Sequence, residues 1–186
     1  SKGVAFLFKK YKVEHINAWG RVLGKGKVGT FDGDGNQQDE INAKHIIIAT
    51  GARPQNIPGI EFDGKRVISY FEAMNLPERP ENLIVLGAGA IGVEFAYFYN
   101  TLGTKVTIVE MLDHILPIED EDVSKELERN FRKKKIALKT KTKVEGIEVT
   151  DSGVKVKVAG AKGEEVLEGD VALMSIGVRG NVENIG

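Results

Sequence analysis

The chain has 186 residues, a formal net charge of −1 and 41% hydrophobic residues. A chain of this length can bury roughly 70% of the surface that it exposes when unfolded, so a substantial core is available. The near-zero charge argues against a nucleic-acid-binding protein, and without a run of about 18 apolar residues no membrane-spanning helix is predicted. The chain contains no cysteine, which excludes a disulfide scaffold, a thiolate metal site and a cysteine nucleophile within these residues.

The first part of the chain predicts a helix followed by short strands. Apolar residues recur at helical spacing in residues 4–11. Residues 13–48 alternate weakly between apolar and polar, and residues 32–37 (DGDGNQ) form a turn cluster. The segment AKHIIIATG (43–51) predicts a buried strand that runs into a glycine.

The pattern changes in residues 75–82, where proline and charge dominate, and we expect the main domain boundary just before this stretch. Residues 83–86 form an all-apolar run, as in a parallel strand that is covered on both faces. A helix is predicted from about Ala90 to Leu102, and Gly103 lies where a glycine commonly ends a helix.

This predicted helix carries an apolar stripe, which we expect to face the core. The stripe consists of Ile91, Phe95, Phe98 and Leu102 at helical spacing. The strand KVTIVE (105–110) follows and completes a β-α-β unit.

A second helix is predicted from about Glu121 to Lys135. It has acids in its first turn and bases in its last, which matches the helix dipole. The remaining segments predict a β-meander and a final strand, at residues 144–149, 154–159, 164–169 and 170–177. The sequence therefore predicts an α/β Rossmann-like fold, with a parallel sheet, helices on both faces and a β-meander.

Gly87, Gly89 and Gly92 have the G-x-G-x-x-G spacing of a dinucleotide-binding turn. In such a turn the first glycine makes the tight bend, the second lets the backbone approach the pyrophosphate, and the third lets helix and strand pack closely. The phosphates then meet free N–H groups at the positive end of the helix. The spacing alone is weak in a chain with 22 glycines, but here it follows an apolar strand, opens a helix and precedes a strand that ends in an acid.

Glu110 is that acid, 18 residues after Gly92. This is close to the separation at which an acid accepts hydrogen bonds from the adenosine ribose. A carboxylate there favours a ribose 2′-hydroxyl and repels a 2′-phosphate, whereas an NADP site would call for a nearby arginine. Residues 111–114 contain no arginine, so the sequence predicts NAD. The alternative is an ordinary turn with a surface glutamate.

The order of elements resembles that of the two-dinucleotide flavoprotein disulfide reductases, over essentially the whole chain. Within that family, the members that oxidise dihydrolipoamide are the most similar. The ATG and GAGxIGxE motifs mark the family, whereas GVAFLFKK and KVEHINAWG favour those members. The similar segments are KGVAFLFKKYKVEHINAWGRV (2–22), ATGARPQNIPGI (49–60), GAGAIGVEF (87–95), ILPIEDEDVS (115–124) and IGVRGNVENIG (176–186).

In that family an NAD(P) domain is inserted into an FAD domain. The resemblance therefore implies a partial FAD-binding domain at residues 1–74, an NAD-binding domain at 75–178 and the start of a return to the FAD domain at 179–186. It also implies cofactor contacts. Of these, only the contacts of the turn glycines and of Glu110 are also supported by the sequence pattern itself. The implied contacts are Gly20, Thr50, Gly51 and Ala52 for FAD, and Gly87, Ala88, Gly89, Ala90, Ile91, Gly92, Val93, Glu94, Glu110, Val144 and Gly177 for NAD.

The resemblance further implies a reaction in which electrons pass from dihydrolipoamide to a disulfide, then to FAD, and finally as hydride to NAD+. The cysteine pair, the first glycine-rich turn for FAD and the His–Glu dyad of the family have no counterpart in these residues. We therefore expect no catalytic residue here and no activity from this segment alone. The intact protein is expected to be a homodimer in the cytoplasm or mitochondrial matrix. It would serve a 2-oxo acid dehydrogenase complex or the glycine cleavage system.

Two other interpretations stay open. The chain could belong to a mercuric reductase, soluble transhydrogenase or NADH peroxidase type of the same family. It could also be a stand-alone NAD-binding module without chemistry of its own. No metal site is predicted, because His15, His45 and His114 are scattered and the acids of residues 118–126 are explained by the helix dipole.

Overall fold

The computed structural model describes residues 1–161 and 163–186. They form two compact units. Unit 1 comprises residues 1–51 and 180–186, and unit 2 comprises residues 52–179. Among the described residues, no helix is long and apolar enough to cross a membrane.

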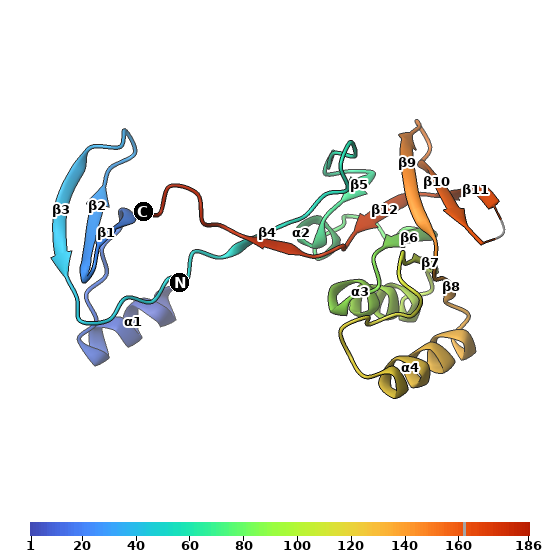
Figure 1. Cartoon of the computed structure of the whole chain (residues 1–186), viewed down its shortest axis with the longest axis horizontal. Coiled ribbons are helices and arrows are strands. Elements are labelled where there is room, and N and C mark those ends of the chain that lie inside the picture. The colour runs from blue at the N-terminus through green and yellow to red at the C-terminus, as the bar shows by residue number, and fades with distance from the viewer. Residues whose placement is uncertain (162) are drawn as a thin grey trace. The chain divides into compact units, whose positions relative to one another are not determined.

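Unit 1 contains one helix and a three-stranded antiparallel sheet (Figure 1). Helix α1 (Lys2–Tyr11) confirms the helical spacing seen in the sequence, and Ser1 caps its first turn. The sheet has the order β1 (Trp19–Gly24), β2 (Lys27–Phe31) and β3 (Gln37–Asn42). The predicted turn cluster connects β2 to β3.

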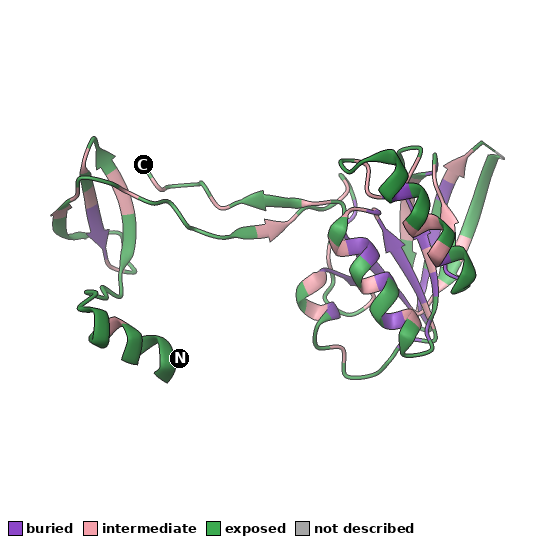
Figure 2. Ribbon diagram, turned by 90° about the horizontal axis from the view of Figure 1, so that it is seen from below, coloured by how far each residue is buried: buried purple, intermediate pink, exposed green. Residues whose placement is uncertain are grey.

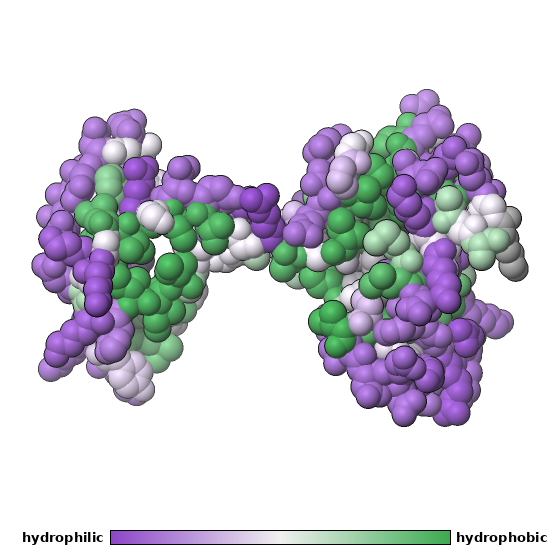
Figure 3. All heavy atoms as spheres, in the orientation of Figure 1, coloured by the Kyte–Doolittle hydropathy of each residue, from purple (hydrophilic) through white to green (hydrophobic). Residues whose placement is uncertain are grey.

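Unit 1 has almost no core of its own. All of its residues are described, and only residues 29–31 at the end of β2 are buried. The guanidinium of Arg21 lies 4.4 Å from the centre of the Phe31 ring and covers it. Helix α1 has no buried residue. Figure 2 shows unit 1 almost entirely exposed, and Figure 3 shows apolar residues at its surface.

The buried strand predicted for residues 43–51 is wrong for this chain. The segment forms no strand, and the side chains of Ile47 and Ile48 are 90% and 58% exposed. A strand requires hydrogen-bonded neighbours, and no described strand pairs with this segment. The chain enters a strand only afterwards, in β4 (Ala52–Pro54), which pairs with β13 (Val178–Gly180).

Unit 2 is built around a five-stranded parallel sheet with the order β5-β12-β6-β7-β8. The chain passes from β6 to β7 and β8 on one side and returns to β12 on the other, so the direction of winding reverses between β6 and β12. Its strands are β5 (Val67–Ile68), β6 (Asn82–Leu86), β7 (Lys105–Val109), β8 (Ala137–Lys139) and β12 (Val171–Met174).

The two faces of this sheet are covered by different layers (Figure 1). Leu83 and Val85 face a core that includes helix residues, whereas Ile84 and Leu86 face the core beneath the meander. The first layer comprises α2 (Tyr70–Ala73), α3 (Ala90–Thr101) and α4 (Glu121–Lys133), and the second comprises β9 (Lys143–Val149), β10 (Val154–Gly160) and β11 (Gly163–Gly169).

The predicted α/β fold with a parallel sheet and a meander is confirmed. It differs in one detail, because the meander rather than a second set of helices covers the other face of the sheet. Strand β10 shows how this works: Val154, Val156 and Val158 are buried, while Lys155 and Lys157 between them are exposed. A strand with one apolar and one charged face replaces an amphipathic helix as the cover.

The face of α3 predicted to point into the core is correct only in part: Phe95 packs against the core cluster and Ile91 is partly buried, but the other half of the stripe is exposed. Phe98 and Leu102 are each 51% exposed. The buried residues of α3 are Gly92, Val93, Ala96 and, in the last turn, Tyr99. The prediction followed the large apolar side chains that recur at helical spacing. The glycine turn fixes the start of α3 instead, and it brings small residues against the sheet, where helix and strand pack closely.

Candidate dinucleotide-binding site

The glycine turn lies at the carboxyl end of β6, between that strand and α3. Strand β12 pairs with β6 on one side and β7 pairs with it on the other. The turn therefore lies where the winding of the sheet reverses. In open α/β sheets, ligands bind at such a point, outside the carboxyl ends of the strands.

The three glycines have distinct structural reasons to be glycine. Gly87 has a φ of 98°, and a Cβ there would lie 2.7 Å from the carbonyl oxygen of Ser175. A Cβ on Gly92 would overlap the carbonyl oxygen of Gly87. Gly89 has an ordinary φ of −70°, and a Cβ there would meet nothing within 4 Å. The space above Gly89 is therefore open for a ligand to approach the backbone, as a pyrophosphate does in this motif.

The carboxylate of Glu110 is held against the glycine turn. Glu110 follows β7 and is only 8% exposed. One carboxylate oxygen accepts the N–H of Ala88 at 2.7 Å, and the other accepts the N–H of Leu112 at 2.9 Å. Glu110, which lies 18 residues after Gly92 in the sequence, therefore contacts the glycine turn directly. Each carboxylate oxygen retains a lone pair for a further donor.

Ser175 is a part of the site that sequence reasoning missed. It follows β12 directly and is 5% exposed. Its hydroxyl lies 3.0 Å from the carbonyl oxygen of Leu86 and 2.9 Å from that of Gly87. A serine after an apolar strand carries no sequence signal, because only the pairing of β12 with β6 brings it to the turn.

Two more backbone hydrogen bonds hold the turn and Glu110. The N–H of Leu116 donates to the carbonyl oxygen of Ala88 at 2.8 Å. The N–H of Glu110 donates to the carbonyl oxygen of Lys139, whose ammonium pairs with Glu165 at 2.6 Å. The sequence has no arginine directly after Glu110. The residue that accepts the Glu110 N–H is Lys139, and its ammonium already pairs with Glu165.

Two predicted NAD contacts come from other elements. Gly177, two residues after Ser175, has a φ of 128°, which favours glycine. Val144 on β9 is half-buried and packs against the cluster that contains Leu86 and Val109, the last residues of β6 and β7. Both lie near the carboxyl edge of the sheet, and their contact with NAD stays a prediction.

The remaining predicted NAD contacts belong to the turn and the start of α3. Ala88 and Val93 are buried in the core, so only their backbone groups could meet a ligand. Ala90 and Glu94 are exposed, and Ile91 is partly exposed. The predicted contacts of these residues therefore divide into backbone contacts and side-chain contacts, which mutation would affect differently.

The predicted FAD contacts lie in two places. Gly20 lies in β1, where its nearest neighbour for a Cβ is Val28 at 3.9 Å. Thr50 and Gly51 precede β4. The Thr50 hydroxyl donates to the carbonyl oxygen of Asn181 at 2.5 Å, and the N–H of Asn181 donates to the carbonyl oxygen of Gly51 at 3.0 Å. Ala52 begins β4.

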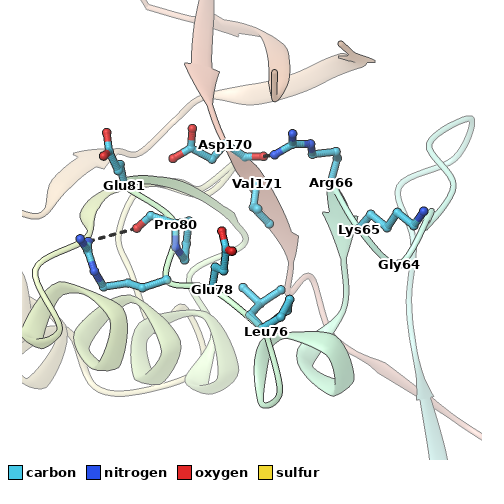
Figure 4. Close-up of a pocket in the computed structure, with 11 residues that line it drawn as sticks. Gly64, Lys65, Arg66, Leu76, Glu78, Pro80, Glu81, Asp170 and Val171 are labelled. Carbon is cyan, nitrogen blue, oxygen red and sulfur yellow. Dashed lines mark hydrogen bonds between the residues drawn. The ribbon is translucent and has the colours of Figure 1, made fainter. Parts of the chain in front are cut away.

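A cavity in unit 2 lies at the opposite edge of the sheet (Figure 4). It has a volume of about 500 Å³ and lies before β5, β6 and β12, at their amino ends. Arg66 donates there to the carbonyl oxygen of Asp170, and Arg79 to that of Pro80. Because ligands of such sheets bind at the carboxyl ends, this cavity is not the dinucleotide site.

A second cavity, of about 260 Å³, lies on the carboxyl side beyond Glu110. It is polar and carries both charges. In the described part of the chain, no group of three or more His, Cys, Asp or Glu side chains could hold a metal ion. The cavity is lined by Asp113, His114, Glu121, Lys125, Glu128 and Lys141.

A family model described as pyridine nucleotide-disulphide oxidoreductase matches residues 1–185. The chain belongs to this family. Two curated relatives carry the name dihydrolipoyl dehydrogenase: one from Chlorobaculum parvum is 40% identical over 100% of this chain, and one from Bacillus subtilis is 37% identical over 99%. The chain spans about 40% of the length of these relatives. A relative from Arabidopsis thaliana, 40% identical over 95% of this chain and 35% of its own length, is named mitochondrial.

Solved structures agree with this membership. LpdA from Mycobacterium tuberculosis gives a TM-score of 0.85 at 30% identity, covering 100% of this chain and 41% of that one. The flavoprotein disulfide reductase RclA from Escherichia coli gives 0.72 at 27% identity, covering 98% and 42%. Members of the family and its dihydrolipoyl dehydrogenases use FAD and NAD, so the cofactors predicted for the intact protein are those of its family.

Proposed function

We propose that this chain is the NAD-binding part of a dihydrolipoyl dehydrogenase, with a portion of its FAD domain. The observation that carries the proposal is the Glu110 carboxylate, held against the glycine turn at the reversal point of the sheet. In the intact enzyme, Gly20 and residues 50–52 would help to hold FAD, which would supply hydride transfer to NAD+ bound at the glycine turn. The chain contains no cysteine, so the cysteine pair of the family would come from other parts of a longer protein.

The turn can bind a pyrophosphate without rearrangement. Gly89 leaves its backbone open, and it is the N-cap of α3, where the helix offers free N–H groups and a positive dipole end. The acceptor groups of the turn are already engaged, because Leu116 donates to Ala88 and Ser175 donates to Gly87. The groups left facing a ligand are therefore predominantly donors, as an anion requires.

Glu110 would select NAD over NADP. Its two oxygens hold backbone N–H groups and keep lone pairs that can accept two ribose hydroxyls. A 2′-phosphate would place a second negative charge beside the carboxylate. Lys139 cannot readily offset that charge, because Glu165 pairs with it.

The FAD part of the proposal rests on Gly20, Thr50, Gly51 and Ala52, together with residues 1–74 and 179–186 as parts of an FAD domain. The NAD domain would span residues 75–178. We extend the proposal to a homodimer in the cytoplasm or mitochondrial matrix that acts on the dihydrolipoyl group of a 2-oxo acid dehydrogenase complex or the glycine cleavage system. The chain by itself is expected not to oxidise dihydrolipoamide.

The test is titration of the chain with NADH and NADPH, followed by cofactor fluorescence. We expect tighter binding of NADH. Glu110→Ala should weaken NADH binding roughly tenfold or more, because a hydrogen bond to a charged group contributes about 1.5–3 kcal/mol. The matched control is Glu168→Ala, which removes an exposed carboxylate on β11. Equal affinities for the two cofactors would contradict the assignment of Glu110.

A further inference from the structure

The Gly87–Ala88 peptide is held from both sides by side chains of neighbouring strands. We propose that Ser175 is a positioning residue that fixes this peptide from its carbonyl side, opposite Glu110, and thereby presets the turn for a dinucleotide. The inference rests on the proposed NAD-binding function and adds to it a residue that neither the motif nor the family resemblance indicated.

The hydroxyl of Ser175 has one hydrogen and two carbonyl oxygens within reach. They belong to Leu86 at 3.0 Å and Gly87 at 2.9 Å. The carbonyl of Leu86 already accepts the backbone N–H of Ser175 at 2.8 Å. The hydroxyl of Ser175 is therefore expected to donate to the carbonyl oxygen of Gly87, which lies beneath the start of α3.

The N–H side of the same peptide is held by Glu110. The N–H of Ala88 donates to that carboxylate at 2.7 Å, and the carbonyl of Ala88 accepts the N–H of Leu116 at 2.8 Å. The N–H of Gly87 in turn donates to the carbonyl oxygen of Val109 at 2.8 Å. Every backbone group of Gly87 and Ala88 thus has a hydrogen-bond partner, and Ser175 is the partner of the Gly87 carbonyl.

A fixed peptide matters here because Gly87 is conformationally permissive. It adopts a φ of 98°, and glycine populates such angles and their mirror images almost equally. Rotation of the peptide plane would turn a carbonyl oxygen toward the Glu110 carboxylate and withdraw the N–H of Ala88 from it. Holding one orientation before the ligand arrives lowers the entropic cost of binding.

The shape of the site requires a small residue at position 175. A Cβ on Gly92 would lie 2.8 Å from the Ser175 hydroxyl oxygen, and a Cβ on Gly87 would lie 2.7 Å from the Ser175 carbonyl oxygen. The Ser175 side chain thus occupies the space that Gly92 leaves free, and its backbone lies against Gly87. Its hydroxyl is the part that distinguishes it from alanine, so alanine keeps the packing and removes only the hydrogen bond.

The test compares Ser175→Ala with Thr104→Val. Thr104 is 2% exposed and its hydroxyl donates to the carbonyl oxygen of Pro80 at 2.7 Å. It precedes β7, at the edge of the sheet opposite the turn. Each variant loses one buried hydroxyl that donates to a backbone carbonyl, so both should lose similar stability.

The affinity for NADH and the hydrogen-exchange rate of the Ala88 amide distinguish the two variants. We expect Ser175→Ala to weaken NADH binding about five- to tenfold, or about 1–1.4 kcal/mol, and Thr104→Val to leave it unchanged. In the absence of cofactor, we expect the Ala88 amide to shift in the NMR spectrum and to exchange its hydrogen faster in Ser175→Ala. Amides within β6 should keep their exchange rates relative to one another. Ser175→Cys, which retains a weaker donor, should lie between serine and alanine in both quantities.

The outcomes separate this inference from the proposed function. Unchanged Ala88 exchange in a folded Ser175→Ala, or equal loss of NADH affinity in Thr104→Val, would overturn the role of Ser175. Faster Ala88 exchange in Ser175→Ala, together with a wild-type chain that fails to bind NADH, would leave the positioning role of Ser175 intact and overturn the NAD proposal. Should Ser175→Ala fail to fold, Ser175→Cys carries the same comparison.

Discussion

Units 1 and 2 come from one chain but differ sharply in how they use their apolar residues. In unit 2 these residues form two clusters, one on each face of the parallel sheet. In unit 1 Phe31 is the one buried apolar side chain, although every residue of that unit is described. Phe6 and Tyr11 of α1 are each 66% exposed, and Ile47 is 90% exposed.

The difference shows that local sequence signals can form a helix or a strand even where no other element packs against it. Both units contain helices that the sequence predicted: α1 (Lys2–Tyr11) has Ser1 as its N-cap and α4 (Glu121–Lys133) has Asp120, and both caps accept a backbone N–H. Only in unit 2 are these elements covered by others. Isolated helices of about ten residues are marginal in water, so we expect unit 1 to be much the less stable of the two.

The largest effect should come from the cores. Leu83→Ala removes a side chain that is 1% exposed in β6, and it should lower the free energy of unfolding by about 2–5 kcal/mol. Phe6→Ala in α1 removes a larger side chain that is 66% exposed, and it should change this quantity by less than about 0.5 kcal/mol. Chemical denaturation of both variants measures the difference. A comparable loss in Phe6→Ala would show that α1 is packed in solution.

The next effect compares two glycines predicted to contact cofactors. Gly92→Ala places a Cβ onto the carbonyl oxygen of Gly87, and it should cost about 2–3 kcal/mol of stability through strain at the turn. Gly20→Ala meets only Val28, at 3.9 Å, and should be close to neutral. Thermal unfolding of the two variants tests this, and a neutral Gly92→Ala would mean that the turn can shift without cost.

A smaller effect concerns the two helices. Ala96 in α3 is fully buried against the core, whereas Ala5 in α1 is exposed. Ala96→Leu overfills a packed site and should cost about 1–3 kcal/mol. Ala5→Leu should be within about 0.5 kcal/mol of the original chain. If Ala96→Leu were neutral, the buried face of α3 would be wrongly assigned.

The sequence predicted most of unit 2, since its signals are strong and agree with each other. The apolar run of β6, the glycine turn and the acid after β7 each indicate the same β-α-β unit. The choice of Glu110 as the acid of the dinucleotide site depended on these signals, and in the structure its carboxylate accepts the N–H of Ala88. What stayed hidden was the pairing of β12 with β6, because strand order is not written in local patterns, and with it the place of Ser175.

The errors have physical causes as well. The apolar stripe of α3 was assigned from large apolar side chains at helical spacing, whereas Gly92 and Ala96 are buried because helix and sheet approach closely there. The segment 43–51 has the composition of a strand, but composition cannot supply the neighbours that a strand needs. The short elements α2 and β5 escaped notice since four and two residues are too few to show a period.

The smallest expected effect compares one carboxylate in each unit on acidification. Hydrogen bonds from the side chain and backbone of Ser69, at 2.6 and 2.9 Å, lower the pKa of Glu72 in α2. Hydrogen bonds from the backbone and side chain of Asn36, at 2.9 and 3.1 Å, lower the pKa of Asp32 in the β2–β3 turn. A pKa depressed in the folded state adds stability above the unfolded pKa, and this stability is lost as pH falls through the folded pKa.

Both units should therefore lose stability below the ordinary pKa values of 4.5 for Glu72 and 3.8 for Asp32, but with different readouts. Glu72→Gln removes the ionisable group, so it should flatten the acid dependence of the cooperative unfolding transition of unit 2. It should also lower the free energy of unfolding at neutral pH, because glutamine can close the capping box with Ser69 but lacks the charge that the lowered pKa links to stability. Asp32→Asn should leave that transition unchanged and alter only the amide exchange of the β2–β3 turn, because unit 1 has no core through which a turn is coupled to global unfolding. Unfolding curves measured from neutral pH to about pH 3 decide the matter: a shift of the cooperative transition in Asp32→Asn would show that the two units unfold together.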